Sequence, residues 1–93
     1  MKGTEKQVKW ATEIRANVIK TFADAASAEP QLKAAISPYI ERISSDDIYA
    51  GDIIDLFSGI RFKGDLQHDV PEVMAVYRVA TPSTDGQRAI LGR

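Results

Sequence analysis

The chain has 93 residues, of which 44% are hydrophobic and 27% are charged, values that favour one folded domain and exclude an intrinsically disordered protein. Its 12 basic and 13 acidic side chains give a formal net charge of -1, which excludes both a strongly basic nucleic-acid coat and an acidic mimic of DNA. Because it has no cysteine, disulfide scaffolds and thiolate zinc sites are excluded as well.

Residues 4–26 are predicted to form one long amphipathic helix. Thr4 and Gln7 have the spacing of a capping box, in which each side chain binds the backbone amide of the other residue. Trp10 lies beside the apolar stripe; because a lone tryptophan in a small domain usually belongs to the core, we expect Trp10 to be buried, with a binding hot spot as the alternative. The stripe itself recurs at steps of three and four residues and consists of Val8, Ala11, Ile14, Val18, Phe22 and Ala25.

A second helical region begins at Pro30, since proline is favoured in the first turn of a helix. Pro38 interrupts this region, because proline lacks an amide hydrogen and clashes with the preceding turn. One interpretation is a single helix that is kinked at Pro38. The other, which we favour, is a short helix that ends near Ser37, followed by a new helix with Pro38 as its first residue.

A third helix is predicted after Ser45, whose side chain would cap it and which is followed by two aspartates in the first turn. Asp52 and Asp55 are expected on the solvent-exposed side of this helix. Its apolar stripe consists of Tyr49, Ile53, Leu56, Phe57 and Ile60.

The segment after residue 68 supports two different predictions. Asp69 and Glu72 have the spacing of a second capping box, and the apolar residues that follow keep a helical period as far as Ala80. The alternative is a β-hairpin, because the segment is rich in valine and Asp85-Gly86 could form its turn. We favour the helix, since the cap and the period agree.

Together these elements predict a mainly α fold, a compact bundle of three to four helices. If residues 73–91 form the hairpin, the class becomes α+β. Residues 1–80 are expected to make a single domain. Residues 81–93 contain Pro, Ser, Thr and Gly and are expected to form a loosely ordered C-terminal tail.

The sequence contains no catalytic constellation, so we predict that the protein is not an enzyme. Asp69 could orient the imidazole of His68 for base catalysis, but neighbouring residues in a loop seldom point toward one another and no nucleophile accompanies them. The aspartates between positions 46 and 55 are explained by helix capping and solvation, and they lack the alternating oxygen ligands of a calcium loop. We therefore predict no metal site and no cofactor.

Two segments contain candidate binding residues. In the loop Gly59–Gly64, backbone amides together with Arg61 and Lys63 would bind a phosphate, and Phe62 would stack on a base. The alternative is a plain surface loop whose Phe62 side chain lies in the core. At the start of the long helix, cations oppose the helix dipole, which suggests that a partner supplies negative charge. The candidates there are Lys6, Lys9, Trp10 and Arg15.

The first and third predicted helices are apolar over more than half of their circumference, which is more than a small domain can cover. We therefore expect a homo-oligomer, in which copies bury this surplus against one another. The sequence has no apolar leader near its start and no run long enough to span a bilayer, so we expect a cytoplasmic protein with no membrane partner.

The segment Lys2–Arg15, KGTEKQVKWATEIR, resembles the opening of small uncharacterised proteins of bacteriophages and mobile elements, which share the pattern T/S-E-K-Q-x-x-W-A-x-x-I-R/K. The residues that match this pattern are Thr4, Glu5, Lys6, Gln7, Trp10, Ala11, Ile14 and Arg15. The resemblance implies a small accessory protein of a phage or an integrated element in a bacterial host. Many such proteins bind and block a host component, including defence systems.

These observations predict a non-enzymatic, anti-CRISPR-like accessory protein that binds and inhibits or sequesters a host factor, either a protein or a nucleotide messenger of bacterial immunity. A small nucleic-acid-binding module is the first alternative, although the balanced charge makes nucleic acid the less favoured partner. Its cations would be Lys6, Lys9, Arg15, Arg61 and Lys63. A structural or assembly protein of a virion or mobile element is the second alternative.

Overall fold

The structure, a computed structural model that describes residues 1–93, consists of helices joined by short loops. The only β-type pairing is an isolated bridge between Lys2 and Tyr49. The predicted mainly α fold is therefore confirmed, and the β-hairpin alternative for residues 73–91 is wrong. None of the helices combines the length and apolar character needed to cross a bilayer. In chain order the elements are α1 (Glu5–Ala28), the 3₁₀ helix η1 (Pro30–Leu32), α2 (Lys33–Ile43), α3 (Ala50–Phe57), α4 (Leu66–Val79) and α5 (Asp85–Leu91).

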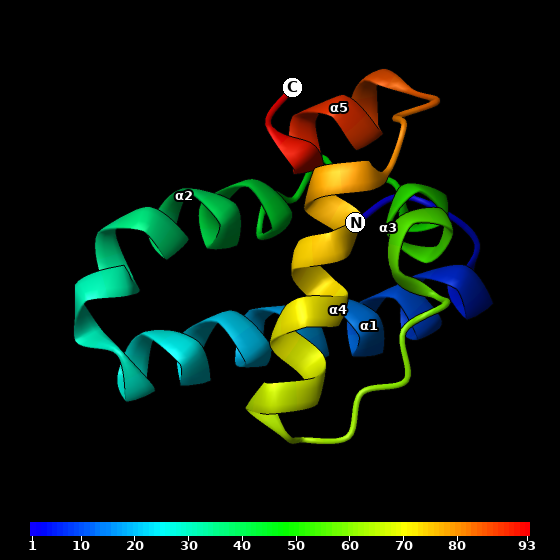
Figure 1. The fold of residues 1–93 in the computed structure, drawn as a ribbon. Helices are drawn as coiled ribbons and strands as arrows, with labels where there is room; N and C mark the ends of the chain where they lie inside the picture. Colours follow the sequence, from blue (N-terminus) through cyan, green and yellow to red (C-terminus); the bar gives the residue numbers. More distant parts are fainter.

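Helix α1 is the platform on which α2, α3 and α4 pack (Figure 1). The predicted capping box fixes its start. The backbone amide of Gln7 donates to Thr4 Oγ1 at 3.2 Å, and the backbone amide of Thr4 donates to the side-chain oxygen Gln7 Oε1 at 3.3 Å. At about 1.5 Å per residue, the 24 residues of α1 span roughly 36 Å, which matches the longest dimension of the molecule, 36 Å. Helix α2 folds back along α1, so the two form a helical hairpin that α4 crosses.

The core is one cluster of buried apolar side chains to which all five α-helices contribute. Helix α1 packs against α3, and Ala11 of α1 and Ala50 of α3 are both fully buried. The remaining core residues are Ile14, Val18, Phe22, Ile43, Ile48, Ile53, Phe57, Val73, Tyr77, Ile90 and Leu91.

The prediction of a helix break at Pro38 is wrong, since α2 continues through Pro38 to Ile43. The Ser37 hydroxyl donates to the Lys33 carbonyl at 2.8 Å, one of the backbone oxygens in the turn that precedes the proline. The continuous helix places Tyr39 against the core and Ile43 within it. Burial of these side chains outweighs the single backbone hydrogen bond that Pro38 cannot make.

The third helix begins later than predicted, at Ala50, and Ser45 does not cap it; its hydroxyl accepts a bond from the Asp47 amide in the preceding turn. Hydrogen bonds to the N-terminal segment explain the later start of this helix. The Lys2 amide donates to the Ile48 carbonyl at 2.9 Å, and the Ala50 amide donates to the Lys2 carbonyl at 2.7 Å. The N-terminal segment therefore holds the residues just before α3 in an extended conformation.

Asp52 was expected in solvent but is 8% exposed, which corrects the sequence prediction. Its Oδ1 accepts a hydrogen bond of 2.8 Å from the hydroxyl of Thr84, the N-cap residue of α5, so this carboxylate connects α3 to α5. Gly86 lies so close that a Cβ there would sit 2.1 Å from Asp52 Oδ2. Asp55 is exposed, as predicted.

Helix α4 confirms the helical prediction for this segment, but it begins at Leu66 rather than after Asp69. Asp65 is the cap, because its Oδ1 accepts a bond of 3.0 Å from the Gln67 amide. Asp69 is instead buried inside the first turns, with 4% of its surface exposed.

The expectation of a loosely ordered tail over residues 81–93 is also wrong, and the domain extends past residue 80. Thr84 caps α5 through a bond of 3.0 Å from the Gln87 amide, and Ile90 is fully buried. The Arg93 guanidinium donates to the carbonyls of Tyr77 and Ala80, which closes the end of α4. The polar residues near position 82 form only a short connection to α5.

Because Ile90 is fully buried, Ile90→Ala is expected to lower the free energy of unfolding by about 3 kcal/mol. Urea denaturation followed by circular dichroism measures the change. Arg88→Ala is the matched control in the same helix: Arg88 pairs with Asp85 at the surface, and its loss should cost less than about 1 kcal/mol. Equal effects of the two variants would mean that α5 is not docked.

The ring of Tyr77 packs against three other aromatic rings. Its ring centroid is 5.7 Å from that of Phe22, 4.9 Å from that of Tyr39 and 5.8 Å from that of Phe57. The hydroxyl is buried and has no hydrogen-bond partner, and burial raises its pKa. The ring therefore stabilises the core while the unpaired hydroxyl costs stability.

Tyr77→Phe is accordingly expected to raise the free energy of unfolding by about 1 kcal/mol, since it keeps the ring and removes an unpaired polar group. Thermal and urea unfolding of the two proteins measure the difference. A less stable phenylalanine variant would mean that the hydroxyl is hydrogen-bonded in solution.

Candidate functional site

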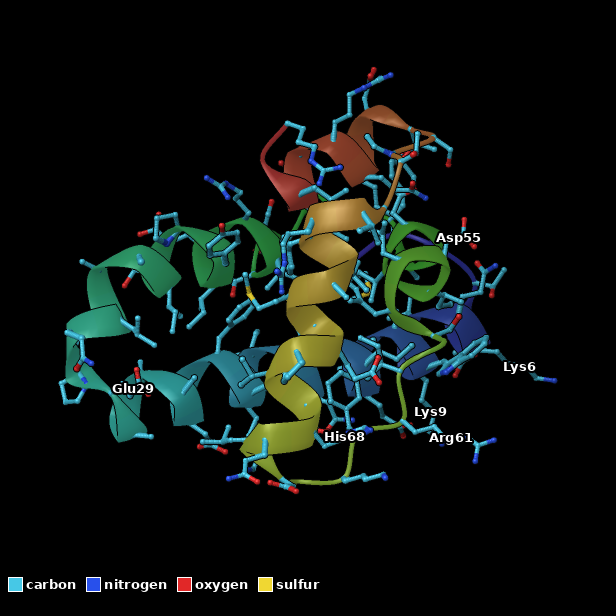
Figure 2. All side chains as sticks on the ribbon, in the orientation of Figure 1. Lys6, Lys9, Glu29, Asp55, Arg61 and His68 are labelled. Carbon is cyan, nitrogen blue, oxygen red and sulfur yellow. The ribbon has the colours of Figure 1, made fainter.

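Trp10 is not a core residue, contrary to the sequence prediction, because 51% of its surface is exposed. The core face of α1 runs through Ala11 and Ile14, and Trp10 lies at its edge. On a helix, Lys6 is one turn before Trp10 and therefore its surface neighbour. Figure 2 shows that the side chains of Lys6, Lys9 and Arg61 extend from the same end of the molecule.

We call Lys6, Lys9, Trp10 and Arg61 the basic–aromatic surface. All four side chains are exposed, and none of the three cations forms an ion pair within the chain. The acidic residues of the same helical turns, such as Glu13, do not neutralise them by direct contact. A half-exposed indole beside unpaired cations is therefore available to a partner.

Arg15 does not belong to this surface. Positions 10 and 15 are separated by roughly 140° around a helix of 3.6 residues per turn, so their side chains leave α1 on different sides. The Arg15 guanidinium donates to the Ser45 carbonyl at 3.4 Å, and the side chain is half-buried. Its contact joins α1 to the turn that follows α2.

The loop Gly59–Gly64 does not present a free phosphate cradle. The Lys63 amide donates to Asp69 Oδ1 at 3.0 Å and the Gly64 amide donates to Oδ2 at 2.9 Å, so an internal carboxylate already occupies both donors. Phe62 packs against the core, as the plain-loop alternative predicted, and its ring is not free to stack on a base. Only the exposed side chains of Arg61 and Lys63 remain available.

His68 and Asp69 do point toward one another, although sequence neighbours were expected not to. His68 Nδ1 lies 2.8 Å from Asp69 Oδ1, and His68 Nε2 lies 3.8 Å from Glu72 Oε1. The hydrogen bond from His68, together with those from two backbone amides, lowers the pKa of Asp69, while burial opposes that shift. All three side chains of this cluster belong to α4, and Asp69 connects the preceding loop to the first turns of that helix through hydrogen bonds.

An apolar groove, which the sequence analysis missed, lies between the α1–α2 hairpin and α4. Its volume is about 290 Å³, and Thr21 is the one polar residue among those that line it. A second hollow continues it toward the tip of the hairpin, where Glu29 lies. We call the larger space the hairpin groove; it is lined by Thr21, Phe22, Ala25, Leu32, Ala35, Ile36, Tyr39, Val70, Val73 and Met74. Since these residues come from α1, η1, α2 and α4, periodicity along the chain does not bring them together.

Comparison with protein-family models, with curated proteins and with solved structures finds no match for this chain.

Asp69→Asn is expected to lower the free energy of unfolding near neutral pH by about 2 kcal/mol, because it weakens the bonds to two amides and to His68. The pKa of Asp69 is lowered in the folded protein, so its contribution is present above its ordinary value of 3.8 and is lost as pH falls toward the folded value. The stability difference between the two proteins should therefore narrow in acid. Urea unfolding from neutral pH to below pH 3.8 measures it.

Asp55→Asn is the matched control, since Asp55 is exposed and forms no side-chain hydrogen bond or ion pair within the chain. This variant should keep the wild-type stability near neutral pH. A constant difference between wild type and Asp69→Asn at every pH would contradict the assigned role of the carboxylate.

Proposed function

We propose that this protein is a non-enzymatic accessory protein of the phage type that binds and inhibits or sequesters a host factor through the basic–aromatic surface. The observation that carries the proposal is the half-exposed Trp10 beside the unpaired cations Lys6 and Lys9. Tryptophan is enriched among the residues that dominate binding energy, and a domain of this size ordinarily buries its single tryptophan.

Six of the eight residues that carry the phage resemblance divide into two groups. Thr4 and Gln7 form the capping box, and Ala11 and Ile14 are buried, so the fold explains all four. Lys6 and Trp10 have no comparable structural role, since Lys6 is exposed and unpaired and Trp10 is exposed. A binding role accounts for those two residues.

The chemistry of the surface favours a protein partner with an acidic patch around an apolar recess. The indole would enter the recess, and Lys6, Lys9 and Arg61 would face carboxylates, which also accelerates association. A nucleotide messenger is the less favoured ligand, because the amides of Lys63 and Gly64 already bind Asp69. We therefore propose a protein component of bacterial immunity as the host factor.

The proposal is tested by plating phage on bacteria that carry a defined immune system, with and without this protein. Wild type should restore plaque formation, and Trp10→Ala and the double variant Lys6→Glu/Lys9→Glu should lose this effect. Calorimetry with the purified immune effector should show at least about 30-fold weaker binding for Trp10→Ala, as expected for a hot spot.

Lys33→Glu is the control, because Lys33 is an exposed cation of α2, outside the basic–aromatic surface. It should protect phage as well as wild type does. If Trp10→Ala and the double lysine variant protect equally well, the basic–aromatic surface is not the binding site.

A second candidate function is single-stranded nucleic-acid binding, which the same observation supports, because an exposed aromatic ring among cations can stack on a base. Its test is the affinity for an unstructured oligonucleotide over a range of salt concentrations. Steep weakening with added salt, with loss in Trp10→Ala, would favour this function, whereas an oligonucleotide that does not bind at low salt would exclude it.

A further inference from the structure

The hairpin groove is a second surface that the proposed function does not use. It lies between α1, α2 and α4, and the hollow next to it reaches Glu29 at the tip of the hairpin (Figure 2). The basic–aromatic surface is at the other end of α1. We propose that a second copy of this chain covers the hairpin groove with the same face, so that the protein is a two-fold symmetric dimer.

The exposed surface of the single chain supports a partner of this kind. The chain exposes 5797 Å², whereas a typical monomer of 10.2 kDa exposes about 5,300 Å². The excess of about 500 Å² is more than half of the roughly 800 Å² that one subunit contributes to a standard interface. Apolar side chains line both hollows on the open side of the hairpin, and a second subunit docked there would cover them.

The face is self-complementary in shape, because a projection and a recess lie side by side. Leu32 is 37% exposed and lines both the hairpin groove and the neighbouring hollow. Ala25, Ala28 and Ala35 border these spaces and are small enough for another helix to approach closely. In a two-fold arrangement, each Leu32 enters the groove of the partner, as an isologous interface requires.

The charges of the face favour a second copy over an unrelated helix. The lining of the hairpin groove contains no charged side chain, so two identical grooves meet without like-charge repulsion. Glu29 lies at one end of this face. At the other end of the face, the Arg42 guanidinium lies over the ring of Tyr39, 5.4 Å from its centroid. Neither Glu29 nor Arg42 forms an ion pair within the chain. A two-fold axis perpendicular to the groove reverses its direction and places Glu29 of one copy opposite Arg42 of the other.

The test is the mass in solution, measured by light scattering from micromolar to near-millimolar concentration. Wild type should shift from monomer to dimer, and Leu32→Glu should remain a monomer. Glu29→Arg and Arg42→Glu should each weaken the dimer about tenfold, because each replaces two attractive pairs per dimer with repulsive ones. The double variant Glu29→Arg/Arg42→Glu should recover the wild-type affinity.

The charge reversals are at exposed positions, so they keep the test valid even if Leu32→Glu unfolds; circular dichroism verifies the fold of each variant. Lys6→Glu/Lys9→Glu is the control and should dimerise as wild type does, which separates this proposal from the proposed function. A monomer at every concentration would overturn the proposal and leave the groove to another occupant. A dimer that the single charge reversals leave unaffected, or that the double variant fails to restore, would overturn this interface.

Discussion

The structure depends on one constraint, which is the burial of the apolar stripe along α1. Each large side chain of that stripe, such as Val18 or Phe22, contributes roughly 2 kcal/mol when it leaves water, whereas an exposed ion pair such as Lys20–Asp24 contributes less than about 1 kcal/mol. Burial therefore decides where α2, α3 and α4 lie, since all three pack on α1. The domain is as long as that one helix because the other elements are shorter and gather around it.

Two buried carboxylates hold the later segments in place. Asp52 accepts a hydrogen bond from Thr84 and connects α3 to α5, while Asp69 binds two amides of the loop before α4. In a sequence, both resemble ordinary helix-surface or capping aspartates. Their actual donors lie in other segments, 32 positions away for Thr84 and 5 for Gly64. Packing of the helices brings Thr84 within reach of Asp52, and the path of the loop before α4 brings Gly64 to Asp69.

The two proposed surfaces are separated by the length of α1, with the basic–aromatic surface at its first turns and Glu29 at its far end (Figure 2). Their chemistry differs accordingly: one combines an indole with unpaired cations, and the other is an apolar groove with one charge of each sign at its ends. A dimer formed through the hairpin groove would leave both copies of the basic–aromatic surface free. Two linked binding surfaces raise the apparent affinity for a partner that presents two sites.

The amino-acid sequence by itself determined the local features of this protein: the capping box at Thr4, the apolar stripe of α1 and the helical character of α4, because each depends on residues within a few positions of one another. Only the tertiary structure decided which polar residues are buried and which apolar ones are exposed. Trp10 became exposed because the neighbouring helices cover the stripe through Ala11 and Ile14 instead, and the last residues became an ordered helix because Ile90 and Leu91 are buried against the body of the domain. The hairpin groove exists only in three dimensions, since α1, α2 and α4 each supply part of its wall.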